Sequence, residues 1–124
     1  MIIGVGCDLA EVDRIGKALQ RKGFRERVYT AAEIEYCTGP KGDKVESYAA
    51  RFAAKEAFLK ALGTGLREGR LLEIEVLNDG LGQPELHLSG HFAALAESRG
   101  VTDIRMSLSH TGNMAMAVVI LEGA

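Results

Sequence analysis

The sequence predicts an α+β domain in which an antiparallel sheet packs against a long central helix. Two observations support this fold class. Residues 44–62 carry apolar side chains at helical spacing and end at a glycine pair around Thr64. Residues 104–121 alternate between apolar and polar side chains on either side of a turn at 111–113, which is typical of an antiparallel hairpin. The chain of 124 residues is the length of one domain, predicted over residues 1–124.

The first half of the chain predicts a strand followed by helices. Residues 1–8 are rich in β-branched and small side chains and favour a strand. Residues 10–22 favour a short helix, with Gly23 as its stop. Residues 31–37 suit a helical turn, and residues 38–42 have the composition of a loop.

The second half predicts strands around one further helix. Leu72, Ile74 and Val76 alternate with glutamates, which indicates a half-buried strand, and a returning strand follows near residues 86–88. Ser89 is a suitable first residue for a helix that runs to about residue 96. With the final hairpin, the predicted order is strand, helix, helix, strand, strand, helix, strand, strand.

Charge and apolar content exclude several classes of protein. The net charge of −2 argues against a nucleic-acid partner, and the apolar runs are too short to span a membrane. With no signal-type N-terminus, we expect a cytoplasmic protein in which Cys7 and Cys37 are reduced. Residues 14–27 nevertheless contain six basic side chains and one acidic one, a local charge of +5. This segment is either a solvated helix face or a surface for a small acidic partner.

Glu56 is the most informative residue of the long helix. It falls on the same helical stripe as Tyr48, Phe52 and Leu59, which we interpret as facing the core. A carboxylate in that position is costly unless it is paired, hydrogen-bonded or bound to a metal. Lys60, one turn later, points in nearly the same direction, so a simple exposed Glu–Lys pair is the alternative.

Two other charged residues of the long helix are expected to face solvent. Arg51 and Lys55 lie on other sides of the predicted helix, where we expect them to be solvated.

Asp8, at the end of the first predicted strand, is either an N-terminal helix cap or a ligand for a bound group. Two carboxylates from distant parts of the chain, without a His or Cys ligand set, suit Mg²⁺ at a phosphate.

Ser107–Thr111 places hydroxyl groups and an imidazole at the end of a predicted strand. Such groups make a suitable seat for a phosphate. A serine nucleophile is disfavoured, because the segment lacks a G-x-S-x-G turn and adjacent strand residues point to opposite faces. The residues therefore permit a Mg²⁺-dependent reaction at a phosphate without naming the substrate.

Four segments together resemble one family, the holo-[acyl-carrier-protein] synthases, which are short 4′-phosphopantetheinyl transferases. The chain from Gly6 to Ile15 matches their G-x-D-x-x-E-x-x-R-I pattern, and residues 51–65 match their central signature. Residues 82–84 and 107–111 are similar to their two later motifs. The likeness spans nearly the whole chain in order, and it implies the 4′-phosphopantetheinyl transferase fold.

The resemblance implies a reaction and a set of roles. Phosphopantetheine would pass from coenzyme A to a serine of apo-acyl carrier protein, releasing adenosine 3′,5′-bisphosphate in support of fatty acid biosynthesis. Asp8 and Glu56 would hold Mg²⁺, and Lys60 would face the pyrophosphate, which makes these three the catalytic set. The proton acceptor stays open between Glu56 and a water on the metal beside Asp8.

The resemblance also assigns binding residues and an assembly. Coenzyme A would contact a set of side chains and glycines from four segments: Arg51, Lys60, Gly63, Gly82, Pro84, Ser109, His110 and Thr111. Lys41 and Lys44 are further candidates for its 3′-phosphate. The acidic carrier protein would meet Arg14, Arg21, Phe24 and Arg25. The family likeness implies a homotrimer whose active sites lie between subunits, with the His110 segment supplied by a neighbour.

Two other functions remain open from the residues alone. One is a different Mg²⁺-dependent phosphate enzyme, such as a small hydrolase. The other is a non-catalytic module that binds acidic proteins through residues 14–27.

Overall fold

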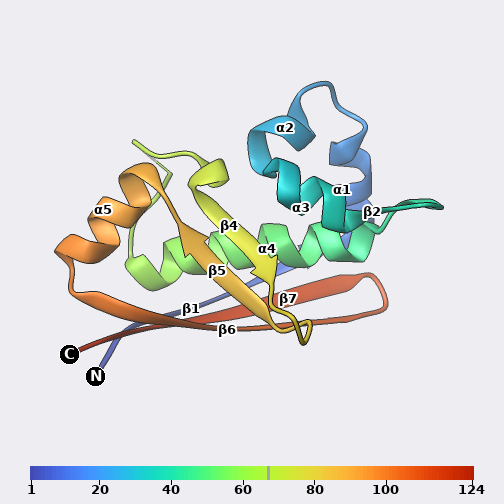
Figure 1. Ribbon diagram of the computed structural model, residues 1–124. Coiled ribbons are helices and arrows are strands. Elements are labelled where there is room, and N and C mark those ends of the chain that lie inside the picture. Colours follow the sequence, from blue (N-terminus) through green and yellow to red (C-terminus); the bar gives the residue numbers. More distant parts are fainter. Residues whose placement is uncertain (67) are drawn as a thin grey trace.

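A long helix, α4 (Val45–Leu62), lies along one face of a three-stranded antiparallel sheet (Figure 1). The computed structural model describes residues 1–66 and 68–124. The sheet has the strand order β1–β7–β6, formed by β1 (Ile2–Glu11), β7 (Met114–Gly123) and β6 (Val101–Thr111). β7 is therefore the central strand, and β1 is an edge strand that lies next to α4.

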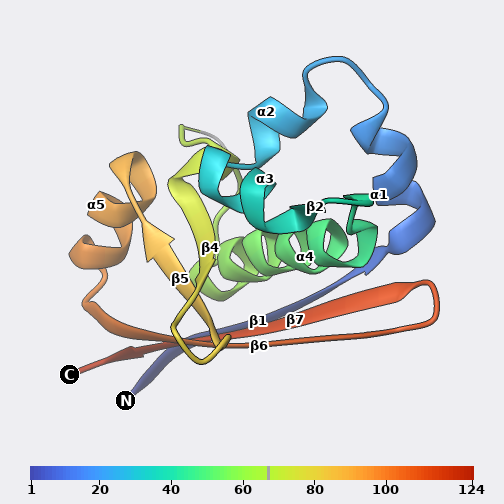
Figure 2. The ribbon, with the colours of Figure 1, turned by 45° about the vertical axis from the view of Figure 1, so that its right-hand side comes forward.

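The remaining elements cover the side of α4 that faces away from the sheet, as Figure 2 shows. Two groups of elements make up this layer. The first is helical: α1 (Val12–Leu19), α2 (Phe24–Val28) and α3 (Ala31–Cys37), followed by the short strands β2 (Thr38–Gly39) and β3 (Gly42–Asp43). The second contains the 3₁₀ turn η1 (Leu71–Glu73), the hairpin β4 (Ile74–Asn78) and β5 (Pro84–Leu88), and α5 (Gly90–Ser98). This arrangement confirms the predicted α+β class.

Several predicted boundaries move in the structure. β1 continues to Glu11, so Asp8 lies inside a strand and is not the cap of the following helix. The helix predicted over 10–22 is the shorter α1, which ends at Leu19. Gly23, with a positive φ of 84°, immediately precedes α2. The predicted loop at 38–42 contains the small β2–β3 hairpin. β4 and β5 form a separate two-stranded sheet.

Helix α4 is buried on almost every side, which contradicts our interpretation of its faces. From Tyr48 to Leu62, the side chains that are not buried are Phe52, Glu56 and Lys60. Their spacing of four residues places them along one line of the helix. The line that contains Glu56 is thus the open side of α4, because the sheet and the outer layer cover the other sides.

The expectation that Lys55 and Arg51 are solvated is also wrong. Arg51 retains an exposed fraction of 3%, and Lys55 is fully buried. The Lys55 ammonium donates to Glu33 Oε1 at 2.8 Å and to the Leu71 carbonyl at 3.0 Å, while Glu33 also accepts from the Val76 amide. Burial lowers the pKa of Lys55, and the Glu33 charge opposes this shift. The pair joins α3, α4 and β4 in the core.

β1 and α4 approach each other unusually closely because glycines face alanines across the contact. A Cβ built on Gly4 would overlap the Ala61 carbonyl oxygen, and one on Gly6 would overlap the Ala57 carbonyl oxygen. Side chains alternate along a strand, so Asp8 is the next residue on this same face. Its partner across the sheet is Ala117, which is fully buried. The contact thereby directs Asp8 toward α4.

Among the helices of the described residues, none is both long and apolar enough to cross a bilayer.

Replacing Gly6 with alanine should destabilise the fold, since the added methyl group must push β1 away from the Ala57 carbonyl. We expect a loss of about 1–3 kcal/mol in the free energy of unfolding, measured by urea denaturation. Gly16→Ala is the matched control, because its Cβ meets Val45 Cγ1 at an ordinary 3.5 Å within α1. That variant should gain about 0.5–1 kcal/mol. Equal stability of the two variants would contradict the close-approach argument.

Candidate active site

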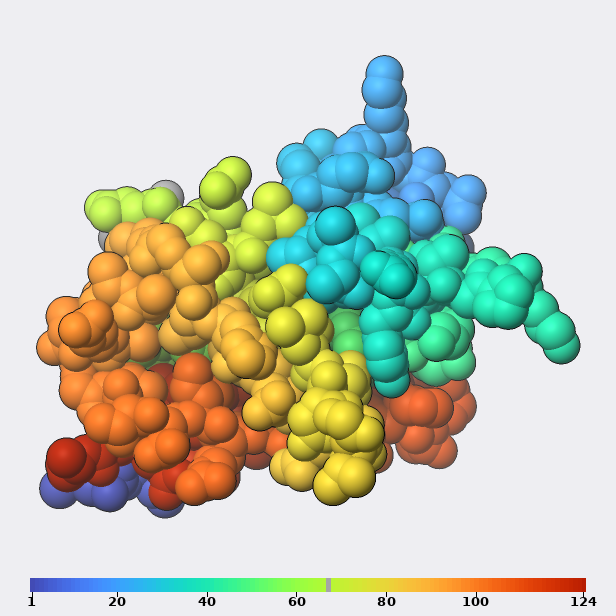
Figure 3. Space-filling view, viewed as in Figure 1, coloured from blue at the N-terminus to red at the C-terminus, as the bar shows by residue number. Residues whose placement is uncertain are grey.

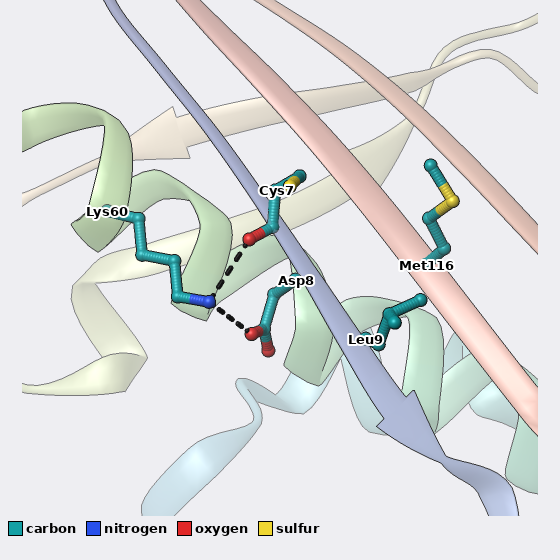
Figure 4. A pocket seen from close by; sticks show the side chains of 5 residues that line it. All are labelled: Cys7, Asp8, Leu9, Lys60 and Met116. Atoms are coloured by element: carbon teal, nitrogen blue, oxygen red, sulfur yellow. Dashed lines mark hydrogen bonds and ion pairs between the residues drawn. The ribbon is translucent and has the colours of Figure 1, made fainter.

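Lys60 and Asp8 form the centre of the candidate site. The Lys60 ammonium extends from the last turn of α4 and donates to Asp8 Oδ1 at 2.8 Å and to the Cys7 carbonyl at 3.2 Å (Figure 4). The side chains of Lys60 and Asp8 keep exposed fractions of 58% and 19%. The hydrogen bond to Asp8 and the charge of Asp8 raise the pKa of Lys60. The ammonium therefore stays charged and accessible at neutral pH.

Glu56 lies one helical turn before Lys60 on the open line of α4. Its side chain is half-buried, and burial is the main reason why its carboxyl pKa is raised. The negative charge of Asp8 raises this pKa further, while Lys60 lowers it. The two carboxylates are thus near enough to repel each other, and a bound cation would relieve that repulsion.

The donor set of this cluster fits Mg²⁺. In the part of the chain that the structure describes, His, Cys, Asp and Glu form no group of three or more that could hold a metal. Asp8 and Glu56 supply oxygen atoms alone, and Mg²⁺ commonly binds one or two carboxylates together with water and substrate phosphates. The pair is therefore suited to a cation that a phosphate ligand helps to hold.

Two adjoining hollows border the Lys60 side chain. One has a volume of about 380 Å³ and is lined by Cys7, Asp8, Leu9, Lys60 and Met116. Because β1 is an edge strand, this hollow reaches residues from both faces of the sheet. The second lies at the end of α4, where Gly63 adopts a left-handed φ of 76° and terminates the helix at the predicted glycines.

A separate hollow of about 390 Å³ brings together residues from distant segments of the sequence. It contains five of the residues implied for coenzyme A: Arg51, Gly82, Pro84, Ser109 and His110. Thr111 does not line it. Sequence reasoning missed Tyr36 and Asn78, which also line this hollow. No spacing signal links them to Arg51, since they reach it from α3 and β4 only in the folded chain.

Arg51 is the buried cation of this separate hollow, which we call the Arg51 hollow. Its guanidinium donates to Asn78 Oδ1 and lies 4.2 Å from the centre of the Tyr36 ring. Its Nε atom is buried without a hydrogen-bond partner. The hollow at Asp8 and the hollow at Arg51 have no lining residue in common.

The basic N-terminal segment divides into two environments. Arg14, Arg21 and Phe24 line a groove of about 420 Å³ beside the open line of α4. Arg25 does not line this groove, because its guanidinium pairs with Asp43 Oδ2 at 2.6 Å and lies over the Tyr48 ring. The break at Gly23 explains the separation, since α2 does not continue the faces of α1.

The fold and these sites define a small α+β protein suited to a phosphorylated nucleotide. The family described as the "4'-phosphopantetheinyl transferase superfamily" matches residues 4–119. The chain therefore belongs to the 4′-phosphopantetheinyl transferase superfamily, as the four motifs predicted.

Curated relatives and solved structures agree with this assignment. The holo-[acyl-carrier-protein] synthase of Solibacter usitatus is 52% identical, with 98% of this chain and 99% of the relative covered. A crystal structure of the synthase from Neisseria meningitidis has a TM-score of 0.86 at 34% identity, covering 98% of this chain and 99% of that one. The synthase from Bacillus anthracis, crystallised in complex with coenzyme A, has a TM-score of 0.82 at 40% identity, covering 100% and 99%.

Glu56→Gln should stabilise the metal-free protein in a pH-dependent way. The folded-state pKa of Glu56 is raised from 4.5, so the folded chain retains a proton that the unfolded chain has released. The contribution of this group to stability therefore falls as pH rises from about 4.5 through the folded pKa. The variant should unfold at a higher temperature than the parent near pH 8, and the difference should vanish below about pH 4.

Thermal denaturation in the presence of EDTA measures this difference across the pH range. The exposed Glu97 of α5 supplies the matched control, and Glu97→Gln should show no such trend. A stability difference for Glu56→Gln that stays constant with pH would contradict the burial argument.

Proposed function

We propose that this chain transfers 4′-phosphopantetheine from coenzyme A to a serine of apo-acyl carrier protein. The reaction releases adenosine 3′,5′-bisphosphate and supports fatty acid biosynthesis in the cytoplasm, with residues 1–124 acting as one domain. The observation that carries this proposal is the Asp8–Lys60 pair beside Glu56 at the contact of β1 with α4. The names of the relatives and the coenzyme A complex of the Bacillus anthracis synthase support it.

In the proposed reaction, the serine oxygen attacks the pyrophosphate phosphorus that bears the pantetheine arm. The bond from that phosphorus to the bridging oxygen breaks, and adenosine 3′,5′-bisphosphate leaves. The serine proton passes either to Glu56 or to a water beside Asp8, which are the two routes that this cluster allows.

Each residue of the cluster has a separate task in this proposal. Asp8 and Glu56 would hold Mg²⁺, which would neutralise charge on the pyrophosphate when it is bound. Lys60 offsets the negative charge that develops on the leaving phosphate, and its raised pKa keeps it protonated. In the free protein Asp8 holds this ammonium in place, and the incoming pyrophosphate offers it a second anionic partner.

The hollow around Arg51 is the proposed seat of the nucleotide and its 3′-phosphate. Arg51 is a buried cation, and none of the ion pairs among the described residues includes it. His110 and Ser109 add hydrogen-bonding groups from β6, and Gly82 and Pro84 border the same space. An anionic ligand would compensate the desolvated guanidinium.

We further propose a homotrimer in which two chains complete each active site. The outer face of the sheet supports this assembly, because Val5 and Leu9 of β1 are 58% and 62% exposed and Met116 of β7 is 41% exposed. A sheet face of this kind is typical of a surface that another chain covers. Asp8 and Glu56 of one chain would then meet the His110 hollow of its neighbour.

The groove between α1, α2 and the open line of α4 is the proposed docking surface for the acidic carrier protein. Arg14 and Arg21 supply positive charge at its rim, and Phe24 supplies apolar surface. Arg25 is next to Phe24 in the sequence but does not line the groove, and its charge is already paired with Asp43. Opposite charges on the two proteins would favour rapid association.

Asp8→Asn and Lys60→Met should each lower turnover by about 100-fold or more, because each removes a charge that acts on the pyrophosphate. Mass spectrometry of apo-carrier protein, incubated with coenzyme A and Mg²⁺, measures the phosphopantetheine gained. Glu97→Gln, the same carboxylate-to-amide change as Asp8→Asn at an exposed residue of α5, should retain the parent rate.

The same assay separates the other functions. Phosphate release without carrier protein would indicate a different phosphate enzyme. Complex formation without any mass gain would indicate a non-catalytic module.

Mixing two variants that each lack one residue proposed for the site tests whether the active site is shared. Asp8→Asn and His110→Ala remove residues that different chains supply to one site, so mixed trimers contain some sites in which both residues are intact. Random assembly of equal amounts should restore about a quarter of the parent activity. Co-refolding followed by native mass spectrometry shows that mixed trimers have formed. Mixed trimers that remain inactive would overturn the shared site.

A further inference from the structure

Tyr36 brings together two cations at the edge of the nucleotide hollow. The side chain projects from α3 and is 44% exposed. The Arg51 guanidinium carbon lies 4.2 Å from the centre of its ring, and the Lys44 ammonium lies 4.8 Å from the same centre. Figure 3 shows the β4–β5 hairpin (yellow) beside the segment around α3 (cyan to teal) on this face. Tyr36 of α3 therefore lines the same hollow as Asn78, Gly82 and Pro84 of the β4–β5 hairpin.

Arg51 is held by neutral groups, which leaves its charge available to a ligand. Its closest partners are the Asn78 amide oxygen and the Tyr36 ring, and its Nε atom is buried without a partner. Glu46 also lines the hollow, but its side chain is exposed and forms no ion pair with Arg51 in the described structure. A buried charge with neutral partners is stabilised when an anion binds.

Lys44 does not line the hollow itself, but its ammonium contacts the ring of Tyr36, which does. It precedes α4 and its side chain is exposed, so without a contact its long stem would sample many rotamers. The electron-rich ring face attracts an ammonium group as well as a guanidinium group. One aromatic side chain thus keeps a mobile cation close to a buried one, despite the repulsion between their charges.

We propose that Tyr36 is a positioning residue that holds Lys44 and Arg51 for the 3′-phosphate of the nucleotide. It thereby sets the preference of this site for coenzyme A over the 3′-dephospho form. The inference rests on the proposed function, because that function places a nucleotide with a 3′-phosphate in this hollow. Tyr36 acts through the two cations and need not touch the ligand.

Isothermal titration calorimetry of the full chain tests this role without requiring turnover. Adenosine 3′,5′-bisphosphate and 5′-AMP are titrated into the parent, Tyr36→Leu and Tyr36→Phe. We expect Tyr36→Leu to weaken binding of the bisphosphate by about fivefold to tenfold, while 5′-AMP changes by less than about twofold. Tyr36→Phe keeps the ring and should retain the parent preference.

Three results would overturn the proposal. They are an equal loss of both ligands in Tyr36→Leu, a loss in Tyr36→Phe as large as in Tyr36→Leu, and a parent protein that does not distinguish the two nucleotides. A merely structural role predicts the first of these. Lys44→Met adds a further check, because its effect should shrink in the Tyr36→Leu background. Fully additive effects would show that Tyr36 does not act through Lys44.

The phosphopantetheine transfer assay separates this inference from the proposed function. A parent chain that prefers the bisphosphate but does not modify carrier protein would overturn the proposed reaction and leave the Tyr36 role standing. A chain that modifies carrier protein but does not prefer the bisphosphate over 5′-AMP would overturn the Tyr36 role and leave the proposed reaction standing.

Discussion

The contact between β1 and α4 is the constraint on which the site depends. Gly4 and Gly6 have no side chains to separate the strand from the helix, so β1 lies against the helix backbone at Ala57 and Ala61. The next residue on this face of the strand is Asp8, and its carboxylate meets Lys60 on the open line of α4. Core packing and the position of a charged group therefore have the same physical origin, since a bulkier contact would displace both.

Helix α4 separates structural charge from charge that remains available to a ligand. Lys55 and its partner Glu33 are both fully buried, so this ion pair joins α3, α4 and β4 and is not accessible to a ligand. Glu56 and Lys60 lie on the one line that neighbouring elements leave open. Arg51 is intermediate in character, because it is buried but has neutral partners and faces a hollow. Burial alone does not distinguish these roles, whereas the partners of each charge do.

The hollow at Asp8 and the hollow at Arg51 are formed by different parts of the chain and have different proposed roles. Asp8 of β1 joins Glu56 and Lys60 of α4 in one cluster, whereas the hairpin tips near β5 and β6 join Arg51 of α4 in the proposed nucleotide seat. The exposed apolar face of β1 and β7 gives a physical reason for a neighbouring chain to pack there. In that arrangement, subunit association and completion of the active site would be one event.

The sequence by itself determined the fold class, the long helix, the final hairpin and the family, because local periodicity and motif spacing encode them. It also singled out Asp8, Glu56 and Lys60. Only the tertiary structure decided which sides of α4 are covered, because helical periodicity orders residues around an axis without showing where neighbouring elements pack. For that reason the burial of Lys55 could not be predicted from the sequence. The same physics explains Tyr36, whose two cationic partners meet it only when α3 packs against the start and middle of α4.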